Sequence, residues 1–385
     1  MKNLKIDEYF PKSYSDSRQR FLEQASHIRE ACQIGFWPVS SKSDTDLFVD
    51  YLWLGPTDKT VKPEKCFVIT SGIHGSEGYA GSAIQSMFLS EILPQIDRRR
   101  TGFLVVHAMN PYGFKHHRRC TENNINLNRN FSISGEIFKR DCSESTRMSQ
   151  VFLTRRPVSS KESFLLKSKH ILAEKIWFGD FSMDQVVKAV SPGQFQNPED
   201  LEYGGKCLEP QSLNLIEMLR NVMGPFKDII GFDLHTGLGD RGRLHLLTDG
   251  NDTSVDQGLF NELFKPKEDQ SIYVFTPSDE EGFYEVHGSL NSVFADLKIK
   301  DQRVCSITME FGTLGHSLEA QVAGWNSFVL DHEGHFYGFT DSDLKNQITT
   351  ENFERSYPND HRWRHDVIIA ARGLFESVLM RAKLL

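Results

Sequence analysis

The chain has 385 residues, with 44 Lys and Arg against 52 Asp and Glu, and a formal net charge of −8. A chain of this length can build one large α/β domain or two smaller ones. The acidic balance argues against a nucleic-acid partner, because binding to phosphates requires a basic face.

The first half of the chain alternates between predicted helices and predicted buried strands. Apolar positions at helical spacing predict a helix over residues 13–34, and the sequence LFVDYLWL predicts a strand at 47–54. Short apolar runs predict buried strands at 66–72 and 103–111, on either side of a helix at 79–93. This alternation is typical of an α/β sheet with helices on its faces.

The middle of the chain differs in character. Residues 132–210 contain charged stretches and the Gly- and Pro-rich sequence SPGQFQNPEDLEYGG at 191–205. We interpret residues 132–210 as a partly helical insertion, and we expect this insertion to pack beside the functional site. Because the sequence shows no internal repeat and no low-complexity linker, we expect a single domain over residues 1–385.

Strands return in the second half, and the chain closes with a helix. Apolar runs predict strands at 228–235, 243–249, 272–277 and 304–312. The amphipathic pattern of residues 361–385 predicts a helix.

The sequence shows no sign of a secretory leader, a membrane span or a disulfide framework. Charges interrupt the N-terminal residues 1–21, and no apolar run reaches the roughly 18 residues that a membrane helix needs. The six cysteines are scattered, with no C-x-x-C pair. We therefore expect reduced thiols and a cytoplasmic protein without a membrane partner.

The first candidate metal ligands lie in SGIHGSEGYAG at 71–81, between a predicted strand and a predicted helix. His74 and Glu77 stand three residues apart, and an imidazole with a carboxylate suits a borderline ion such as Zn²⁺. The glycines allow a tight turn, so both side chains can converge on one point. The same residues also fit a helix N-terminus at which Ser76 caps and Glu77 meets the helix dipole.

The second candidate cluster is DLHTGLG at 233–239. His235 ends a predicted buried strand, where α/β proteins place their sites. Three protein ligands leave a fourth position for water, which is the catalytic pattern. Asp233 lies on the same face of the strand and can support the site through a hydrogen bond. A histidine at a strand end can equally be a satisfied core or surface residue.

The third cluster is TMEFGT at 308–313, in which Glu310 ends an apolar strand. A carboxylate in such a run is costly unless it is used or paired. Glu310 is either a general base that activates water or a structural glutamate with a partner. Because all three clusters fall at strand ends, we favour the functional interpretation.

Taken in order, HGSEG, NPYGF, an arginine, NLNRNF, DLHTG and MEFGT resemble the zinc carboxypeptidase superfamily over about residues 71–313. The strings GQFQNPEDLEYGG and DLHTGLG look like a little-characterised bacterial branch, and aspartoacylase and succinylglutamate desuccinylase share the catalytic layout. The resemblance implies a three-layer α/β/α fold with a central mixed, mostly parallel sheet. It also implies one zinc ion held by His74, Glu77 and His235, with Glu310 as the catalytic base.

The resemblance implies roles for the basic segment between these clusters as well. An arginine after NPYGF stabilises the oxyanion, and Arg119 has the matching spacing to Asn128, with Arg118 as the neighbouring alternative. Asn128 and Arg129 match the pair that binds a substrate carboxylate. The chemistry agrees, because a guanidinium grips a carboxylate with two hydrogen bonds and stabilises a developing oxyanion. The basic run before Asn128 also fits a solvated loop.

The sequence departs from the superfamily pattern at two points. Asn126 stands where many carboxypeptidases have the Asp that orients a zinc-bound histidine, so Asp233 is an alternative source of this support. No motif fixes the tyrosine that closes over the substrate, for which Tyr284 is the candidate. His245 and His287 could approach the site, but surface positions are favoured for both.

The sequence therefore predicts zinc-dependent hydrolysis of an amide bond next to a free carboxylate, in a peptide or an N-acyl amino acid. An aspartoacylase-like deacylase would use the same ligands and stays an alternative. A non-catalytic binding protein on the same fold is a further alternative, although such a protein has no need of the base. A second metal would need further ligands, for which Asp233 and Asp240 are candidates.

Overall fold

The computed structural model describes residues 5–28, 31–161, 163, 165–166, 189–248, 255–277, 286–315 and 317–385. Within these residues one mixed sheet has the strand order β1-β2-β4-β3-β5-β8-β6-β7. Its strands are β1 (Cys32–Pro38), β2 (Phe48–Leu54), β3 (Lys65–Ser71), β4 (Thr101–His107), β5 (Asp228–Gly237), β6 (Leu244–Thr248), β7 (Tyr273–Pro277) and β8 (Arg303–Gly312). The four central strands β4, β3, β5 and β8 are parallel, whereas β2 and β6 pair antiparallel at their flanks.

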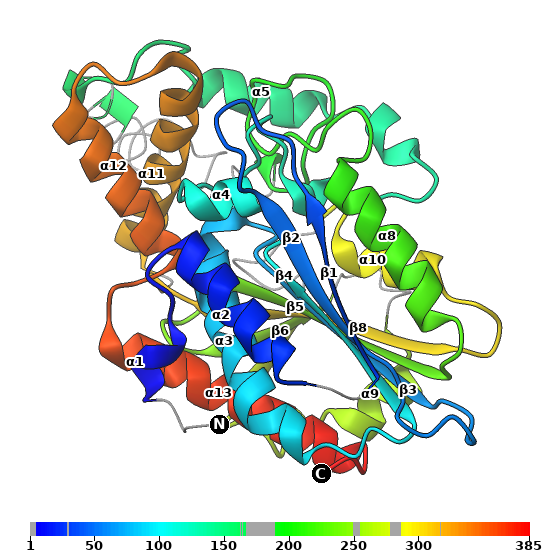
Figure 1. Ribbon diagram of the computed structural model, residues 1–385. Helices are drawn as coiled ribbons and strands as arrows, with labels where there is room; N and C mark the ends of the chain where they lie inside the picture. Colours follow the sequence, from blue (N-terminus) through cyan, green and yellow to red (C-terminus); the bar gives the residue numbers. More distant parts are fainter. Residues whose placement is uncertain are drawn as a thin grey trace.

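Helices cover both faces of the sheet (Figure 1). One face carries α1 (Ile6–Tyr9), α2 (Tyr14–Ser26), α3 (Gly78–Met87), α9 (Gln257–Leu263) and α13 (His361–Arg381), and the other carries α8 (Pro210–Met223) and α10 (Leu290–Asp296). Alternate strand residues point to opposite faces, so Ile69 contacts the first helical layer and Val68 the second. The three-layer α/β/α fold with a mixed, mostly parallel sheet is therefore confirmed.

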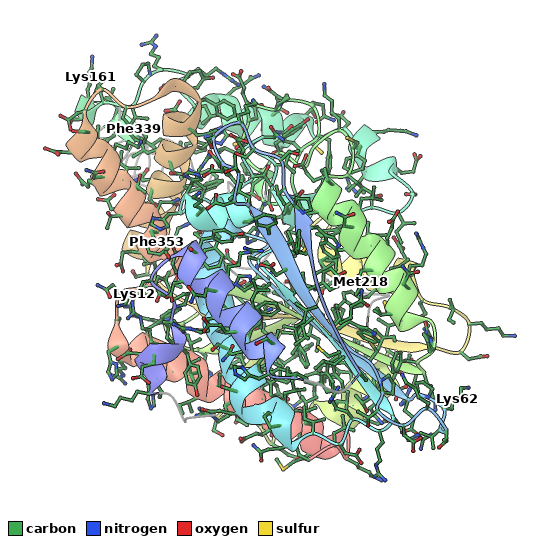
Figure 2. The ribbon with its side chains drawn as sticks, viewed as in Figure 1. Lys12, Lys62, Lys161, Met218, Phe339 and Phe353 are labelled. Atoms are coloured by element: carbon green, nitrogen blue, oxygen red, sulfur yellow. The ribbon has the colours of Figure 1, made fainter. Side chains whose placement is uncertain are left out.

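A separate apolar cluster joins α5 (Ser143–Phe152), α11 (Leu318–Tyr337) and α12 (Ser342–Ser356). Phe339, labelled in Figure 2, packs against this cluster. Phe353 of α12, also labelled there, stacks on His117 with ring centroids 4.1 Å apart. The end of α12 also contacts the carboxyl ends of the strands, because Thr236 Oγ1 donates to the carbonyl of Ser356 over 2.6 Å.

The predicted strands are all present, but the N-terminal segment differs from its prediction. The helix predicted over residues 13–34 ends at Ser26, and Cys32–Pro38 form the edge strand β1 instead. The helix predicted at 79–93 begins at Gly78 and changes at Phe88 into one turn of π-helix (Phe88–Ile92). No helix in the described part of the chain combines the length and the apolar character that crossing a membrane requires.

Candidate metal centre

Three potential ligand side chains meet at the carboxyl ends of β3 and β5, which are neighbouring parallel strands. His74 follows β3 and is the N-cap residue of the 3-10 turn η1 (Gly75–Glu77), which Glu77 ends. His235 lies near the end of β5. One ligand atom from each of the three lies within 4.8 Å of the others, and all three residues are buried.

The distances between these atoms suit a single ion. His74 Nδ1 lies 2.8 Å from Glu77 Oε1, and His235 Nδ1 lies 3.0 Å from Glu77 Oε2. The two Nδ1 atoms are 3.2 Å apart. Two nitrogens bound to one tetrahedral zinc ion, each at about 2.0–2.1 Å, stand roughly 3.3 Å apart. The types of the donor atoms and the distances between them therefore fit one zinc ion.

The turn that carries His74 and Glu77 packs directly against the chain around α4 (Pro111–Lys115). A Cβ on Gly75 would lie 2.1 Å from the carbonyl carbon of Gly113, so only glycine allows this close approach. The Gly75 amide donates to the carbonyl of Arg119 over 3.2 Å, and the next amide donates to the carbonyl of Arg118 over 3.0 Å. The turn that carries His74 and Glu77 and the basic segment are thus one packed unit.

Asp233 supports His235 from within the same strand. Its Oδ2 lies 2.7 Å from His235 Nε2, and its Oδ1 accepts from Thr70 Oγ1 over 2.7 Å. Burial would lower the pKa of His235, but the carboxylates of Asp233 and Glu77 outweigh it and raise that pKa well above its usual value. The hydrogen bond at Nε2 leaves Nδ1 as the atom that faces His74 and Glu77.

Asn126 does not take the place of the missing Asp beside His74. Its amide donates to Glu202, and its Oδ1 accepts from the Asn128 amide over 2.9 Å. His74 Nε2 is buried and has no hydrogen-bond partner among the described residues. Among the described residues, Asn126 therefore does not support His74. Asp233 supports the other histidine, His235.

Glu310 lies beside His235, because the two residues are register partners in β8 and β5. Its Oε1 accepts a hydrogen bond from the Leu238 amide over 2.8 Å. Burial, and then the negative charge of Glu77, raise the pKa of Glu310 above its usual value. On the other side of β8, the register partner of Glu310 is His245 of the antiparallel strand β6.

His245 is buried, which corrects the prediction of a surface position; its Nδ1 lies 2.9 Å from Thr276 Oγ1. His287 is half-buried, and its amide donates to the carbonyl of Pro192. Asp240 is exposed and is not part of the potential metal-binding group. Tyr284 lies outside the described residues.

The two neighbouring arginines point to different parts of the molecule. Arg119 Nη1 lies 3.1 Å from His74 Nδ1 and 3.5 Å from Glu77 Oε1. Arg118 Nε instead donates to Asp331 of α11 over 3.3 Å. Of the two alternatives raised by the sequence, Arg119 is therefore the one that contacts the candidate metal ligands.

Arg129 is buried, with 1% of its surface exposed. Its Nε donates to the carbonyl of Ser191 over 2.7 Å, and its Nη1 donates to the carbonyl of Asn128 over 2.8 Å. A Cβ on Gly193 would lie 2.8 Å from Arg129 Cδ, which shows how closely this segment covers the side chain. A substrate carboxylate can reach Arg129 in this arrangement only if a covering residue moves.

Glu202 is the site residue that the sequence reasoning missed. Its Oε1 accepts from Arg119 Nε over 2.9 Å, and its Oε2 accepts from Asn126 and lies 3.5 Å from Arg129 Nη2. Burial would raise the pKa of Glu202, but the charges of Arg119 and Arg129 outweigh it and hold that pKa at about 2. The only signal in the sequence was an acidic residue just before Tyr203 and two glycines.

Comparisons with known proteins agree with this fold. The crystal structure of thrombin-activatable fibrinolysis inhibitor has a TM-score of 0.50 and 13% identity, covering 96% of this chain and 74% of that chain. The bovine protein in complex with tick carboxypeptidase inhibitor has a TM-score of 0.49 and 13% identity, covering 96% and 99%. A metallo-carboxypeptidase from Burkholderia cenocepacia has a TM-score of 0.41 and 14% identity, covering 85% and 70%.

The fold that the motif resemblance implies is confirmed by the neighbour with a TM-score of 0.50. Among curated proteins, none matches the sequence. A family model described as "Protein of unknown function (DUF2817)" matches residues 10–370. This match spans nearly the whole chain, and the protein therefore belongs to the DUF2817 family.

Proposed function

We propose that this protein is a zinc-dependent hydrolase that cleaves an amide bond next to a free carboxylate. The observation that carries the proposal is the convergence of His74, Glu77 and His235, with Glu310 at the adjacent register position. Three protein ligands leave room for water or substrate, which is the pattern of a catalytic rather than a structural zinc site.

A bound zinc ion supplies Lewis acidity, which polarises a carbonyl and makes water more acidic. Glu310 accepts the proton of the attacking water and passes it to the leaving nitrogen. The Leu238 amide holds Oε1 of this carboxylate, and we assign the proton transfer to Oε2. His235 and Glu310 come from adjacent strands, so the sheet fixes the base relative to the ligands.

Arg119 stabilises the negative charge that develops on the carbonyl oxygen. Its guanidinium lies at the edge of the ligand cluster, 3.1 Å from His74 Nδ1. A fixed positive charge in such a buried place is worth more than in water, and it needs no rearrangement when the reaction occurs.

Asn128 and Arg129 are the proposed binding pair for the substrate carboxylate. Arg119, Arg129 and Glu202 together carry two positive charges and one negative charge, so one net positive charge remains to attract an anion. Because Arg129 is covered in this structure, binding in this subsite requires the segment at Ser191 to move.

Glu310→Gln tests the proposal. The variant should keep its zinc and lose at least about 100-fold in kcat, because it cannot accept the proton. Turnover is measured on N-acyl dipeptides and on N-acetyl and N-succinyl amino acids, which also separates the peptidase from the deacylase. Glu262→Gln, at an exposed position paired with Arg303, is the matched control. Full activity of Glu310→Gln would refute the assignment of the base.

A further inference from the structure

Glu202 connects the two arginines of the candidate site, although it is not one of the potential metal ligands. Its two carboxylate oxygens contact different partners, Arg119 through Oε1, and Asn126 and Arg129 through Oε2. The side chain is 6% exposed. A buried carboxylate with three polar partners has a defined orientation, and so do the partners that it holds.

The backbone at Glu202 adopts a conformation that side chains other than glycine rarely take. Its φ is +52°, in the left-handed region. Residues other than glycine are strained in this region, and they persist where the surrounding structure holds them, often at functional sites. Here the carbonyl of Glu202 accepts from the Gln194 amide over 3.2 Å, and the carbonyl of Tyr203 accepts from the Asn126 amide over 2.7 Å. These bonds hold the backbone from which the Glu202 side chain extends to Arg119 and Arg129.

Arg119 is fixed at both ends as a result. Its carbonyl accepts from the Gly75 amide of the metal-binding turn over 3.2 Å, which ties its backbone to that turn. Its Nε donates to Glu202, which leaves the Nη1 end of the guanidinium beside His74 Nδ1. The bond at Nε therefore acts together with the Nη1 contacts to His74 and Glu77 to select one rotamer of this long, flexible side chain.

We infer that Glu202 is a positioning residue that aims the Arg119 guanidinium at the reacting carbonyl. The inference rests on the proposed function, because Arg119 needs to be aimed only if a charge develops beside the metal ligands. Glu202 acts through Arg119 and does not touch the substrate. It should therefore affect kcat more than KM.

Glu202→Gln is the sharpest perturbation. The amide keeps the volume of the side chain but replaces one acceptor oxygen by a donor. Whichever way the amide turns, either Arg119 Nε or Asn126 Nδ2 then faces a donor and loses its acceptor. Glu199→Gln is the matched control, because Glu199 lies in the same segment with a 52% exposed side chain.

The experiment is a double-mutant cycle on the zinc-loaded full chain, with wild type, Glu202→Gln, Arg119→Ala and the double variant. Glu202→Gln should lower kcat about tenfold or more with KM within about threefold, and in the Arg119→Ala background it should change kcat less than about twofold. Zinc content and thermal melting of each variant show whether the site and the fold are retained. Glu199→Gln should match wild type.

Equal losses from Glu202→Gln in both backgrounds, or wild-type kcat in Glu202→Gln, would overturn the inference while Arg119 keeps its role. If Arg119→Ala and Glu310→Gln both keep wild-type kcat, the proposed function itself fails. Should Glu202→Gln not fold, Asn126→Ala takes its place, since it removes one contact of Glu202 and leaves no buried charge unpaired. A loss of kcat from Asn126→Ala that persists unchanged in the Arg119→Ala background would then overturn the inference.

Discussion

Replacing Asp233 by Asn removes a single charge from the support of His235 and leaves the shape of the side chain intact. Asp233 Oδ2 lies 2.7 Å from His235 Nε2, and Thr70 Oγ1 donates to Oδ1. In Asp233→Asn the amide oxygen can still accept from His235, and the amide nitrogen can donate to the Thr70 hydroxyl. The hydrogen-bond geometry is retained, so the variant reports on the charge.

The size of the effect follows from the contact that changes. A hydrogen bond to an ionised acceptor is roughly twice as strong as a neutral one, and the difference makes the imidazole a better electron donor to a metal. Loss of such support costs about 10–100-fold in metal affinity, which corresponds to about 1.4–2.7 kcal/mol. We expect the zinc Kd of Asp233→Asn to rise within this range.

The assay is zinc binding in competition with a chelator of known affinity, at constant pH and ionic strength. Asp228→Asn is the matched control, because Asp228 begins the same strand and pairs with Arg303 at the opposite end of it. Asp228→Asn should leave the zinc Kd unchanged. An unchanged zinc Kd in Asp233→Asn, or an equal rise in both variants, would refute the reasoning about this charge.

Two further predictions concern packing and stability. Gly75→Ala should weaken zinc binding, because its Cβ would meet the backbone of the adjacent helix at 2.1 Å, whereas Gly224→Ala meets no atom closer than 3.9 Å and should bind zinc normally. Arg381→Met should lower Tm by about 2–4 °C at neutral pH, because it removes charged hydrogen bonds to Asp269 that are worth about 1.5–3 kcal/mol. Lys345→Met, at an exposed position, is the control. The Arg381 bond lowers the pKa of Asp269, so its contribution is present above the unfolded-state pKa of about 3.9, and the Tm difference should shrink as pH falls below that value. Equal zinc affinity of the two glycine variants, or a Tm difference that grows in acid, would contradict these expectations.

The central strands and the convergence of the three candidate ligands could be predicted because their signals are local and strong. Continuous apolar runs such as residues 66–72 are typical of strands buried on both faces. Since parallel strands end at the same edge of a sheet, candidate ligands at the ends of β3 and β5 were expected to meet. The register places Ser71 beside Leu234 and so brings His74 close to His235.

The edge strand β1 could not be separated from the helix before it. Its residues continue an apolar spacing that also fits a helix, and their exposure alternates only weakly. Ala31 precedes the strand with a φ of +49°, which ends any helical continuation, but no feature of the sequence indicates this.

The choice between the two arginines and the role of Glu202 depend on tertiary contacts. His117 has a φ of +56°. After it, the Arg118 side chain contacts Asp331, and the Arg119 side chain contacts Glu202. Spacing alone could not show this divergence. The segment with Glu202 comes to the site from more than 70 positions away along the chain, so its carboxylate could not be assigned a partner.

The most direct test of the account is the zinc stoichiometry of the purified chain, before and after substitution of the shared carboxylate ligand. The wild type, dialysed against metal-free buffer after loading, should hold one equivalent of zinc per chain. Glu77→Ala should hold none under the same conditions, because Glu77 contacts both histidine nitrogens of the centre. A wild type that binds no zinc, or a Glu77→Ala variant that still retains a full equivalent, would contradict the account.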